Sequence, residues 1–279
     1  MENAIPESLP AELAFLAPVE VDGLMRLGNP HDGGYVVPRS TVQSVDTLLS
    51  FGLSSDWTFE EEFKRINASA TIHAYDHTVG ARKFRRAFER GIPRLLRGRI
   101  TLRELQARFR TWRTYRQFFA SEATHFKERI HAVNAGPGHA TIGKVFGRTN
   151  SDRVLLKIDI EGAEYGIIGE VLRHAGRIQL LIVEFHETMA LRETFCAALQ
   201  RLLREFHIVH VHGNNHSYIA PDGLPNVLEI TFVKGPAPDS ARRRQQLPVA
   251  GLDGPNQRDR ADVPIRFVMV TAASQAERS

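Results

Sequence analysis

The chain has 279 residues, of which 42% are hydrophobic and 24% charged, and its formal net charge is +4. These values are typical of soluble globular proteins and exclude a collagen-like, disulfide-rich or disordered chain. One cysteine excludes an internal disulfide, no apolar run reaches the ~18 residues of a membrane span, and residues 1–20 lack the pattern of a secretory signal, so we expect a cytoplasmic protein.

A lead-in over residues 1–25 is followed by the run RLGNPHDGGYVVP, residues 26–38. This run predicts a loop that leads into a short extended segment, and its glycine pair indicates a tight turn or a close backbone approach. We count Asp32 and Gly34 of this loop among the candidate cofactor-binding residues.

Two strand patterns follow. The run TLLSFGL, residues 47–53, predicts the first strand of an α/β domain, and the next residues have the N-cap and acidic first turn of a helix. The run ATIHAYD, residues 70–76, predicts a second strand whose terminal Asp76 lies 24 residues beyond Gly52. A separation of ~20 residues is expected between a nucleotide-binding loop and the carboxylate that binds its ribose.

A basic helical insertion is predicted over residues 82–120. Between Arg82 and Arg116 the chain has thirteen basic and two acidic residues, a net charge of +11, with apolar residues at roughly helical spacing. The insertion would suit an anionic membrane surface, a nucleic acid or a sugar phosphate, and a solvated face of a lid-like helical pair is the simplest alternative.

The central pattern is VLLKIDIEGAEY, residues 154–165, which comes after a predicted strand at 129–135 and a predicted helix at about 139–149. Its nearly continuous apolar run predicts a strand covered on both faces of a parallel sheet. The strand delivers Asp159 and Glu161 to its carboxyl end, where open α/β sheets bind ligands. Glu161 fits a helix cap as well as a functional role, whereas Asp159 favours function.

Three further strands are predicted, at residues 178–186, 207–215 and 227–234, with a helix at 191–206 between the first two. The first two carry side chains that could converge with Asp159, namely Glu184, His186 and His212. An imidazole there suits a general base, so Asp159, His186 and His212 are the catalytic candidates. The mixed oxygen and nitrogen donors also suit Mg²⁺ or Mn²⁺, with Asp159, Glu184 and His186 as candidate ligands.

Residues 235–279 are rich in proline and arginine and predict a flexible tail, with a segment at 262–272 that could dock as an added strand.

The pieces DGGYVV, LLSFGLSSDWTFEEEF, HAYD, LLKIDIEGAEY, VEFH and HVHGNN, in this order, resemble the FkbM-type methyltransferases, a family of class I S-adenosylmethionine-dependent methyltransferases. The resemblance covers residues 26–234 apart from the insertion. It implies an α/β, Rossmann-like fold with helices around a seven-stranded sheet in the order 3-2-1-4-5-7-6, the last strand antiparallel.

The resemblance also implies a cofactor site for S-adenosylmethionine. Asp76 would accept the ribose hydroxyls and Asp159 would face the methyl donor, and the other carried-over positions are a cofactor loop of Ser50, Phe51 and Gly52 and an adenine border of Asn134 and Ala135. The familiar loop has two or three glycines, whereas this chain offers Gly52 alone. That departure suggests a shallower or differently supported site.

The function expected from the resemblance is O-methylation of a hydroxyl on a sugar, a glycan precursor or a small metabolite. The main alternative is a non-catalytic module that binds a polyanion through the arginine-rich insertion, either by peripheral membrane contact through residues 82–120 or by another anionic partner, with nucleic acid the less favoured one. A nucleotide-dependent oxidoreductase is a third option, which the absence of G-x-G-x-x-G after the first strand weakens.

Overall fold

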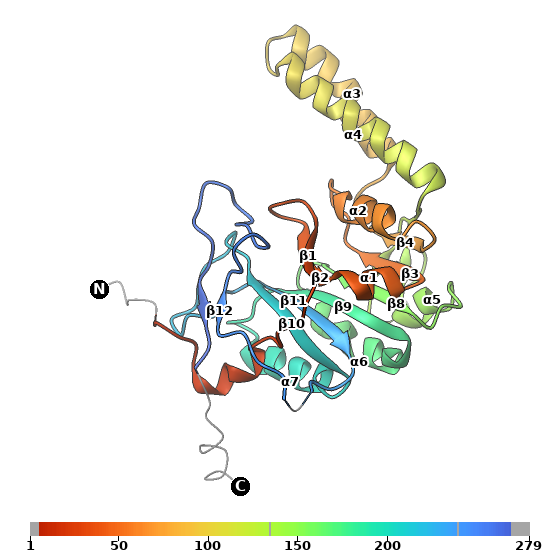
Figure 1. The fold of residues 1–279 in the computed structure, drawn as a ribbon. Helices are drawn as coiled ribbons and strands as arrows, with labels where there is room; N and C mark the ends of the chain where they lie inside the picture. The colour runs from red at the N-terminus through yellow and green to blue at the C-terminus, as the bar shows by residue number, and fades with distance from the viewer. Residues whose placement is uncertain (1–5, 134, 239, 269–279) are drawn as a thin grey trace.

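The computed structural model describes residues 6–133, 135–238 and 240–268, and a seven-stranded sheet lies at its centre (Figure 1). The order of the strands across the sheet is β5-β4-β3-β8-β9-β11-β10. The bounds are β3 Thr47–Phe51, β4 Thr71–Tyr75, β5 Thr124–Phe126, β8 Val154–Ile158, β9 Ile178–Phe185, β10 Phe206–Gly213 and β11 Leu228–Lys234. Only β11 runs antiparallel to its neighbours within this sheet, so the order is the predicted 3-2-1-4-5-7-6.

The sheet separates two apolar layers. Successive strand residues point to opposite faces, so Leu155 enters one core cluster and Leu156 the other. All five residues of β8 are buried, as the continuous apolar run predicted. Helices and short 3₁₀ turns cover the two faces, at η1 Ala11–Leu16, α1 Arg39–Ser44, α2 Thr58–Ile66, α5 Ile142–Phe146, α6 Glu164–Arg173, η2 Ala175–Arg177 and α7 Arg192–Leu202. Among the described helices, none is both long enough and apolar enough to cross a bilayer.

A small hairpin precedes the sheet. Strands β1 (Leu24–Gly28) and β2 (Gly34–Pro38) pair antiparallel, with the predicted loop between them. A Cβ on Gly34 would lie 1.9 Å from the carbonyl oxygen of Asn29, so the close backbone approach inferred from the glycine pair is present.

The basic insertion is a pair of antiparallel helices, α3 (Ala81–Leu96) and α4 (Leu102–Ser121), which extends away from the body of the molecule (Figure 1). A capping box starts α4, because Thr101 accepts from the backbone N–H of Glu104 and the Glu104 carboxylate accepts from that of Thr101. At the base of the pair, Trp57 packs edge-on against Tyr115, with ring centroids 5.5 Å apart. The insertion is therefore anchored to the loop that precedes α2.

The third strand of the sheet does not lie at residues 129–135. The sheet strand is β5, which has three residues, and Arg129–Ile130 instead forms β6, which pairs with β7 (His139–Ala140) in a separate two-stranded sheet. The expected helix at 139–149 is likewise reduced to the five residues of α5. A three-residue edge strand directly after a long helix has too few residues to show an apolar period of its own.

Of the predicted tail at 235–279, residues 240–268 are packed against the body, which the prediction of a flexible tail did not anticipate, and residues 239 and 269–279 fall outside the described residues. Strand β12 (Gln246–Leu247) pairs with β13 (Ile265–Arg266), which lies within the predicted docked segment 262–272. Residues 269–272 of that segment fall outside the described residues. Three apolar side chains of this stretch are buried, namely Leu247, Val263 and Phe267. The many prolines and charged residues around them made this packing hard to predict from sequence.

Candidate functional site

The site lies where β3 and β8, the first and fourth strands of the sheet, run side by side. The chain leaves β3 toward β4 and β5 and then returns to β8, and this reversal leaves a crevice at the carboxyl ends of the strands. Gly52 follows β3 with φ +84°, and a Cβ there would lie 1.8 Å from the carbonyl oxygen of Asp159. Only glycine permits both this conformation and this contact.

One cavity, of about 320 Å³, opens between the loops after β3, β4 and β8. This volume lies within the usual range of small-molecule sites. Its lining combines backbone, carboxylates and apolar side chains, from Gly52, Ser54, Tyr75, Asp76, His77, Thr78, Glu128, Arg129, Ile130, Asp159, Ile160, Glu161 and Ala163. We call it the cofactor cavity.

Asp76 organises the wall of the cofactor cavity. Its Oδ2 accepts from the backbone N–H groups of Leu53 and Ser54 at 3.1 and 2.9 Å, and its Oδ1 accepts from the backbone N–H and the hydroxyl of Thr78, each at 2.6 Å. Burial alone would raise the pKa of Asp76, but the hydrogen bonds from Thr78, Ser54 and Leu53 lower it overall. Asp76 is thus an ionised support for the loop after β3, which lacks the usual glycines.

A second cavity, of about 560 Å³, lies beside the first and is lined mainly by polar groups. We call it the acceptor cavity. Its lining is Asn29, Asp32, Gly33, Gly52, Leu53, Ser54, Ser55, Asp56, Phe59, Glu60, Lys157, Asp159, Glu161, Glu184, His186, Asn214, His216, Ser217 and Val227. Four of these residues also line the cofactor cavity, namely Gly52, Ser54, Asp159 and Glu161. The two cavities therefore meet around Asp159.

The junction holds a buried acidic cluster that shares protons. The Tyr35 hydroxyl lies 3.2 Å from Asp159 Oδ2 and 3.1 Å from Glu184 Oε2, and Asn214 donates to Glu184 Oε1 at 3.0 Å. Burial raises the pKa of Glu184 well above its usual value, and the charge of Asp159 adds to this. A phenol has one proton, so a protonated Glu184 can donate to Tyr35 while Tyr35 donates to Asp159.

Lys157 supplies a cation beside this cluster. Its ammonium donates to the carbonyl oxygen of Gly52 at 2.9 Å and lies over the Tyr35 ring, 5.4 Å from the centroid. Burial raises the pKa of Asp159, and Lys157 and His186 act in the opposite direction. Asp159 thus has a lysine and a histidine beside it that favour its charged form.

His186 is held by a buried glutamate. Its Nδ1 lies 3.0 Å from Glu164 Oε1, and the same oxygen accepts from the backbone N–H groups of Ile160 and Gly162. Burial disfavours the imidazolium, but the hydrogen bond and the charge of Glu164 outweigh it and raise the pKa of His186. With Nδ1–H donated to Glu164, Nε2 faces the junction, 3.6 Å from Glu161 Oε2.

Residues 121–214 match the family model described as the methyltransferase FkbM domain. This part of the chain is therefore similar to FkbM methyltransferase domains. The match includes the carboxyl ends of β8 and β9, and so it contains Asp159, His186 and Glu164. The family supports methyl transfer from S-adenosylmethionine as the general activity.

Solved structures are distantly similar to the chain. The fibrillarin/Nop5p complex aligns with a TM-score of 0.38 at 11% identity, over 68% of this chain and 73% of that one. Precorrin-6y C5,15-methyltransferase from Geobacter metallireducens GS-15 aligns with a TM-score of 0.35 at 14% identity, over 71% and 85%. The Methanococcus jannaschii fibrillarin pre-rRNA processing protein aligns with a TM-score of 0.38 at 10% identity, over 71% and 70%. Among curated proteins, none matches the chain.

The FkbM domain brings together three predicted residues, Asp159, Glu184 and His186. The donor atoms that lie within 4.8 Å of one another belong to Asp159, Glu161 and His186, so Glu161 replaces Glu184 in the most compact potential metal set. Glu161 is not a helix cap, because α6 begins at Glu164 and Glu161 projects from a left-handed backbone with φ +56°.

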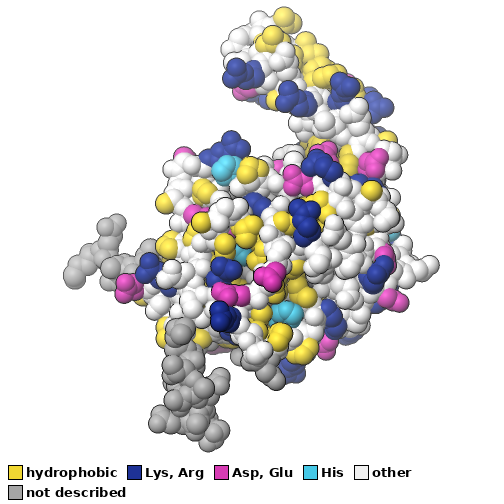
Figure 2. Space-filling model, in the orientation of Figure 1, with side chains coloured by type: hydrophobic (Ala, Val, Ile, Leu, Met, Phe, Trp, Pro, Cys, Tyr) yellow, Lys and Arg dark blue, Asp and Glu magenta, His cyan; other side chains and the backbone are white. Residues whose placement is uncertain are grey.

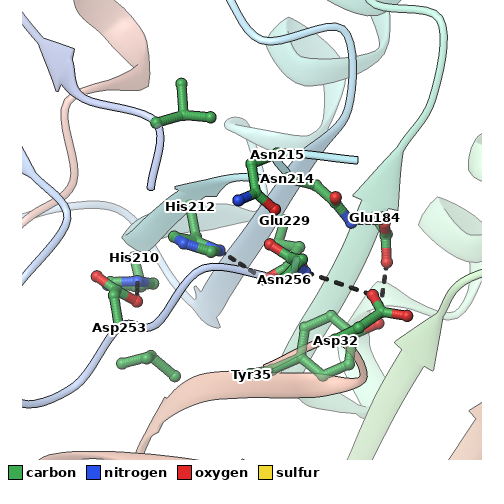
Figure 3. Close-up of polar contacts among 12 residues, drawn as sticks. Asp32, Tyr35, Glu184, His210, His212, Asn214, Asn215, Glu229, Asp253 and Asn256 are labelled. Atoms are coloured by element: carbon green, nitrogen blue, oxygen red, sulfur yellow. Dashed lines mark hydrogen bonds and ion pairs between the residues drawn. The ribbon is translucent and has the colours of Figure 1, made fainter. Parts of the chain in front are cut away.

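His212 lines neither cavity. Figure 3 shows it among the polar side chains near Glu229. It is buried on β10, with Nδ1 3.1 Å from Glu229 and Nε2 3.0 Å from Asp262. Burial opposes its charge, but these two carboxylates raise the pKa of His212 to about 10. An imidazole that is charged at neutral pH and enclosed between two carboxylates is poorly placed to take a proton from an acceptor, so the structure places His212 away from the other catalytic candidates.

Several predicted cofactor residues occupy other places. Ser50 is buried and bonded to Glu60, and Phe51 packs edge-on against Tyr75, so only Gly52 of the predicted loop reaches the cavities. Asp32 lines the acceptor cavity rather than the cofactor cavity, and Gly34 serves the turn described above.

At the adenine end, Ala135 is exposed and lines neither cavity, and Asn134 falls outside the described residues. Residues 128–130 occupy that wall of the cofactor cavity instead.

Sequence reasoning missed Lys157, Glu164 and Tyr35. Lys157 and Glu164 lie within the KIDIEGAEY motif itself, and a charged residue inside an otherwise buried strand was an available signal. Tyr35 gave no such signal, because it comes from a hairpin 149 residues away from Glu184 in sequence.

Proposed function

We propose that the FkbM domain transfers a methyl group from S-adenosylmethionine to a hydroxyl of a neutral, polyhydroxylated acceptor, such as a sugar or a glycan precursor. The observation that supports this most is the meeting of two cavities at Asp159. A displacement reaction needs donor and acceptor in line, and their alignment can contribute ~7 to 11 kcal/mol to catalysis.

The cofactor cavity fits a sulfonium donor. S-adenosylmethionine supplies an activated methyl group when bound, and the cavity offers carboxylates at its junction end and Ile130 toward its far wall. Its volume suits a ligand of this class. Asp76 would position the ribose by holding Ser54 and Thr78, whose polar groups line the same wall.

The lining of the acceptor cavity favours hydroxyls. Carboxylates, amides and hydroxyls predominate in it, and such groups bind polyols through several hydrogen bonds. Asp32, Asp56 and Glu60 are among its acidic residues, and they would repel a phosphate. A neutral sugar therefore fits this cavity better than a sugar phosphate does.

We propose that His186 takes the proton of the acceptor hydroxyl. Glu164 fixes the tautomer with Nδ1 protonated, so the Nε2 lone pair is free to act as general base. Asp159, at the junction, would orient the same hydroxyl. An imidazole has the right basicity for this near neutral pH.

Binding of a divalent metal is an alternative role for Asp159 and His186. Asp159, Glu161 and His186 could hold Mg²⁺ or Mn²⁺, which would acidify and orient an acceptor hydroxyl. The donor set, two carboxylates and one imidazole, fits such an ion. Assays with and without Mg²⁺ after chelation distinguish the two roles.

The deciding experiment has two parts. Calorimetric titration with S-adenosylhomocysteine should show binding to wild type, weakened at least about tenfold in Asp76→Ala by loss of the supported loop. Asp46→Ala is the control, because Asp46 is an exposed aspartate paired with Arg153. Radiolabelled methyl transfer should then be tested on neutral sugars and on their phosphates.

Two results would defeat the proposal. If the wild type binds neither S-adenosylmethionine nor S-adenosylhomocysteine, a non-catalytic module becomes the better hypothesis. Methyl transfer to phosphorylated sugars in preference to neutral ones would contradict the inference that the acceptor cavity binds a neutral sugar.

A further inference from the structure

The insertion helices form a long arm with a distinct end. At 1.5 Å per residue, α3 is ~24 Å and α4 is ~30 Å long. Figure 1 shows that the turn between them is far from the sheet. We define residues 92–109 as the tip. The cavities described above have no lining residue in the tip.

The tip exposes large apolar side chains. Leu96 is 82% exposed and Leu102 58%, and Ile92 and Phe109 are 44% and 42% exposed. Figure 2 shows hydrophobic side chains along one side of the arm and at its end, with Lys and Arg side chains around them. Placing this much apolar surface in water is unfavourable, and a concentration of it on a projecting element marks an interaction surface.

The tip is also strongly cationic. Its basic side chains are Arg94, Arg97, Arg99, Arg103 and Arg108, against the single acid Glu104. Among the described residues, no carboxylate oxygen lies within 4 Å of these guanidinium groups. The region from Arg82 to Arg116 has a net charge of +11 and the whole chain has +4, so the rest of the chain has a net charge of −7. An anionic surface would therefore attract the arm and repel the body.

Most aromatic rings of the arm pack against one another or against Trp57. Trp57, Phe84 and Tyr115 form one group with ring centroids 5.1 to 5.7 Å apart, and Phe88 stacks on Trp112 at 6.0 Å. Binding to single-stranded nucleic acid depends on open ring faces on which bases stack. The most exposed groups of the tip are instead aliphatic, and these suit acyl chains.

We propose that the tip docks on an anionic lipid bilayer. Ile92, Leu96 and Leu102 enter the boundary between headgroups and acyl chains, and the surrounding arginines remain at the lipid phosphates. The arm then holds the catalytic body near the membrane surface. This inference rests on the arm alone and does not require that the proposed methyl transfer be correct.

The test is sedimentation of the full chain with vesicles. Vesicles of phosphatidylcholine with phosphatidylglycerol should bind the wild type, vesicles of pure phosphatidylcholine should bind it weakly, and added salt should reduce binding. The double variant Leu96→Ser/Leu102→Ser should lose at least about tenfold in partition coefficient. The matched control is Met189→Ser/Leu191→Ser, whose targets are 43% and 38% exposed on the body.

All four substituted side chains are exposed, so their replacement should leave the fold intact. Thermal unfolding checks that each variant is folded. Absence of binding to anionic vesicles overturns the proposal. So does vesicle binding that the tip variant leaves unchanged, because that would be charge attraction without insertion. Binding to RNA in preference to the anionic vesicles would assign the arm to nucleic acid instead.

Discussion

At the scale of single residues, the site depends on side chains and backbone that meet at the ends of β3 and β8. Gly52, Asp159 and Glu161 all lie at that meeting point, and two of them follow from the sequence motif. Tyr35 hydrogen-bonds to Asp159, and Glu164 hydrogen-bonds to the neighbouring His186, so these two residues influence the protonation states at the junction.

Gly52→Ala should remove cofactor binding. The new Cβ would lie 1.8 Å from the Asp159 carbonyl oxygen in a backbone with φ +84°, so the loop must shift. We expect a loss of stability of ~2 kcal/mol or more and no measurable binding of S-adenosylhomocysteine. Calorimetry and urea unfolding check this.

The control is Gly23→Ala, at φ +68° with nothing within 4 Å of the new Cβ. Equal loss of cofactor binding in both variants would show that backbone strain alone, and not the contact with Asp159, explains the effect.

The methyl transfer rate should fall as the pH drops through the pKa of His186. Burial opposes the charged form of His186, but its contacts with Glu164 raise the pKa above the usual imidazole value, so the imidazole is protonated and loses its basic lone pair at a higher pH than a free histidine does. His186→Gln should lower kcat by ~10²-fold or more and abolish this limb of the pH profile. If the rate of His186→Gln still falls at low pH as the wild-type rate does, a group other than His186 causes that fall.

At the scale of elements, the carboxyl-terminal segment is joined to the sheet by buried polar contacts (Figure 3). His210 meets Asp253 at 2.9 Å and His212 meets Asp262 at 3.0 Å. Asn256 donates to Glu229 at 2.6 Å and to Asp32, on the acceptor cavity, at 3.4 Å. The segment therefore supports one wall of that cavity.

This attachment should weaken at high pH. The pKa of His212 is raised to about 10 in the folded chain, so its contribution to stability is fully present below the unfolded value near 6.5 and is lost as the pH rises through about 10. His212→Gln should cost ~3 kcal/mol at pH 6.5 and make stability less sensitive to pH between 6.5 and 10. Urea unfolding at several pH values measures both.

His207→Gln serves as the comparison, because this half-buried histidine on the same strand bonds only to the carbonyl of Gly235. The same change in pH sensitivity in that variant would contradict the role assigned to His212.

At the scale of the whole molecule, the tip of the arm lies apart from the two cavities. Replacing the tip, residues 92–109, by a short Gly-Ser turn should leave the aromatic base around Trp57 intact. S-adenosylhomocysteine at 100 times its Kd should then raise the free energy of unfolding of wild type and of the shortened chain equally, by ~2.7 kcal/mol. Thermal unfolding with and without S-adenosylhomocysteine tests this, and a smaller shift in the shortened chain would show that the tip contributes to the cofactor site.

Much of the fold and the core of the site could be predicted from the chain. Continuous apolar runs identified β8 and β9 because burial on both faces leaves that local pattern, and the family resemblance supplied a strand order that the structure confirms. Asp159 and His186 were predicted to lie together because the carboxyl ends of parallel strands meet at one edge of the sheet, and the structure places them side by side.

The tertiary structure alone decided the remaining roles. His186 follows β9 and His212 lies near the end of β10, yet His186 faces a cavity and His212 is enclosed between Glu229 and Asp262. The partners of a buried polar group come from segments distant in sequence, as Asp262 and Tyr35 do, and no local period encodes that pairing. Local pattern thus determined which segments form strands and helices, and long-range packing determined which of their polar side chains reach the site.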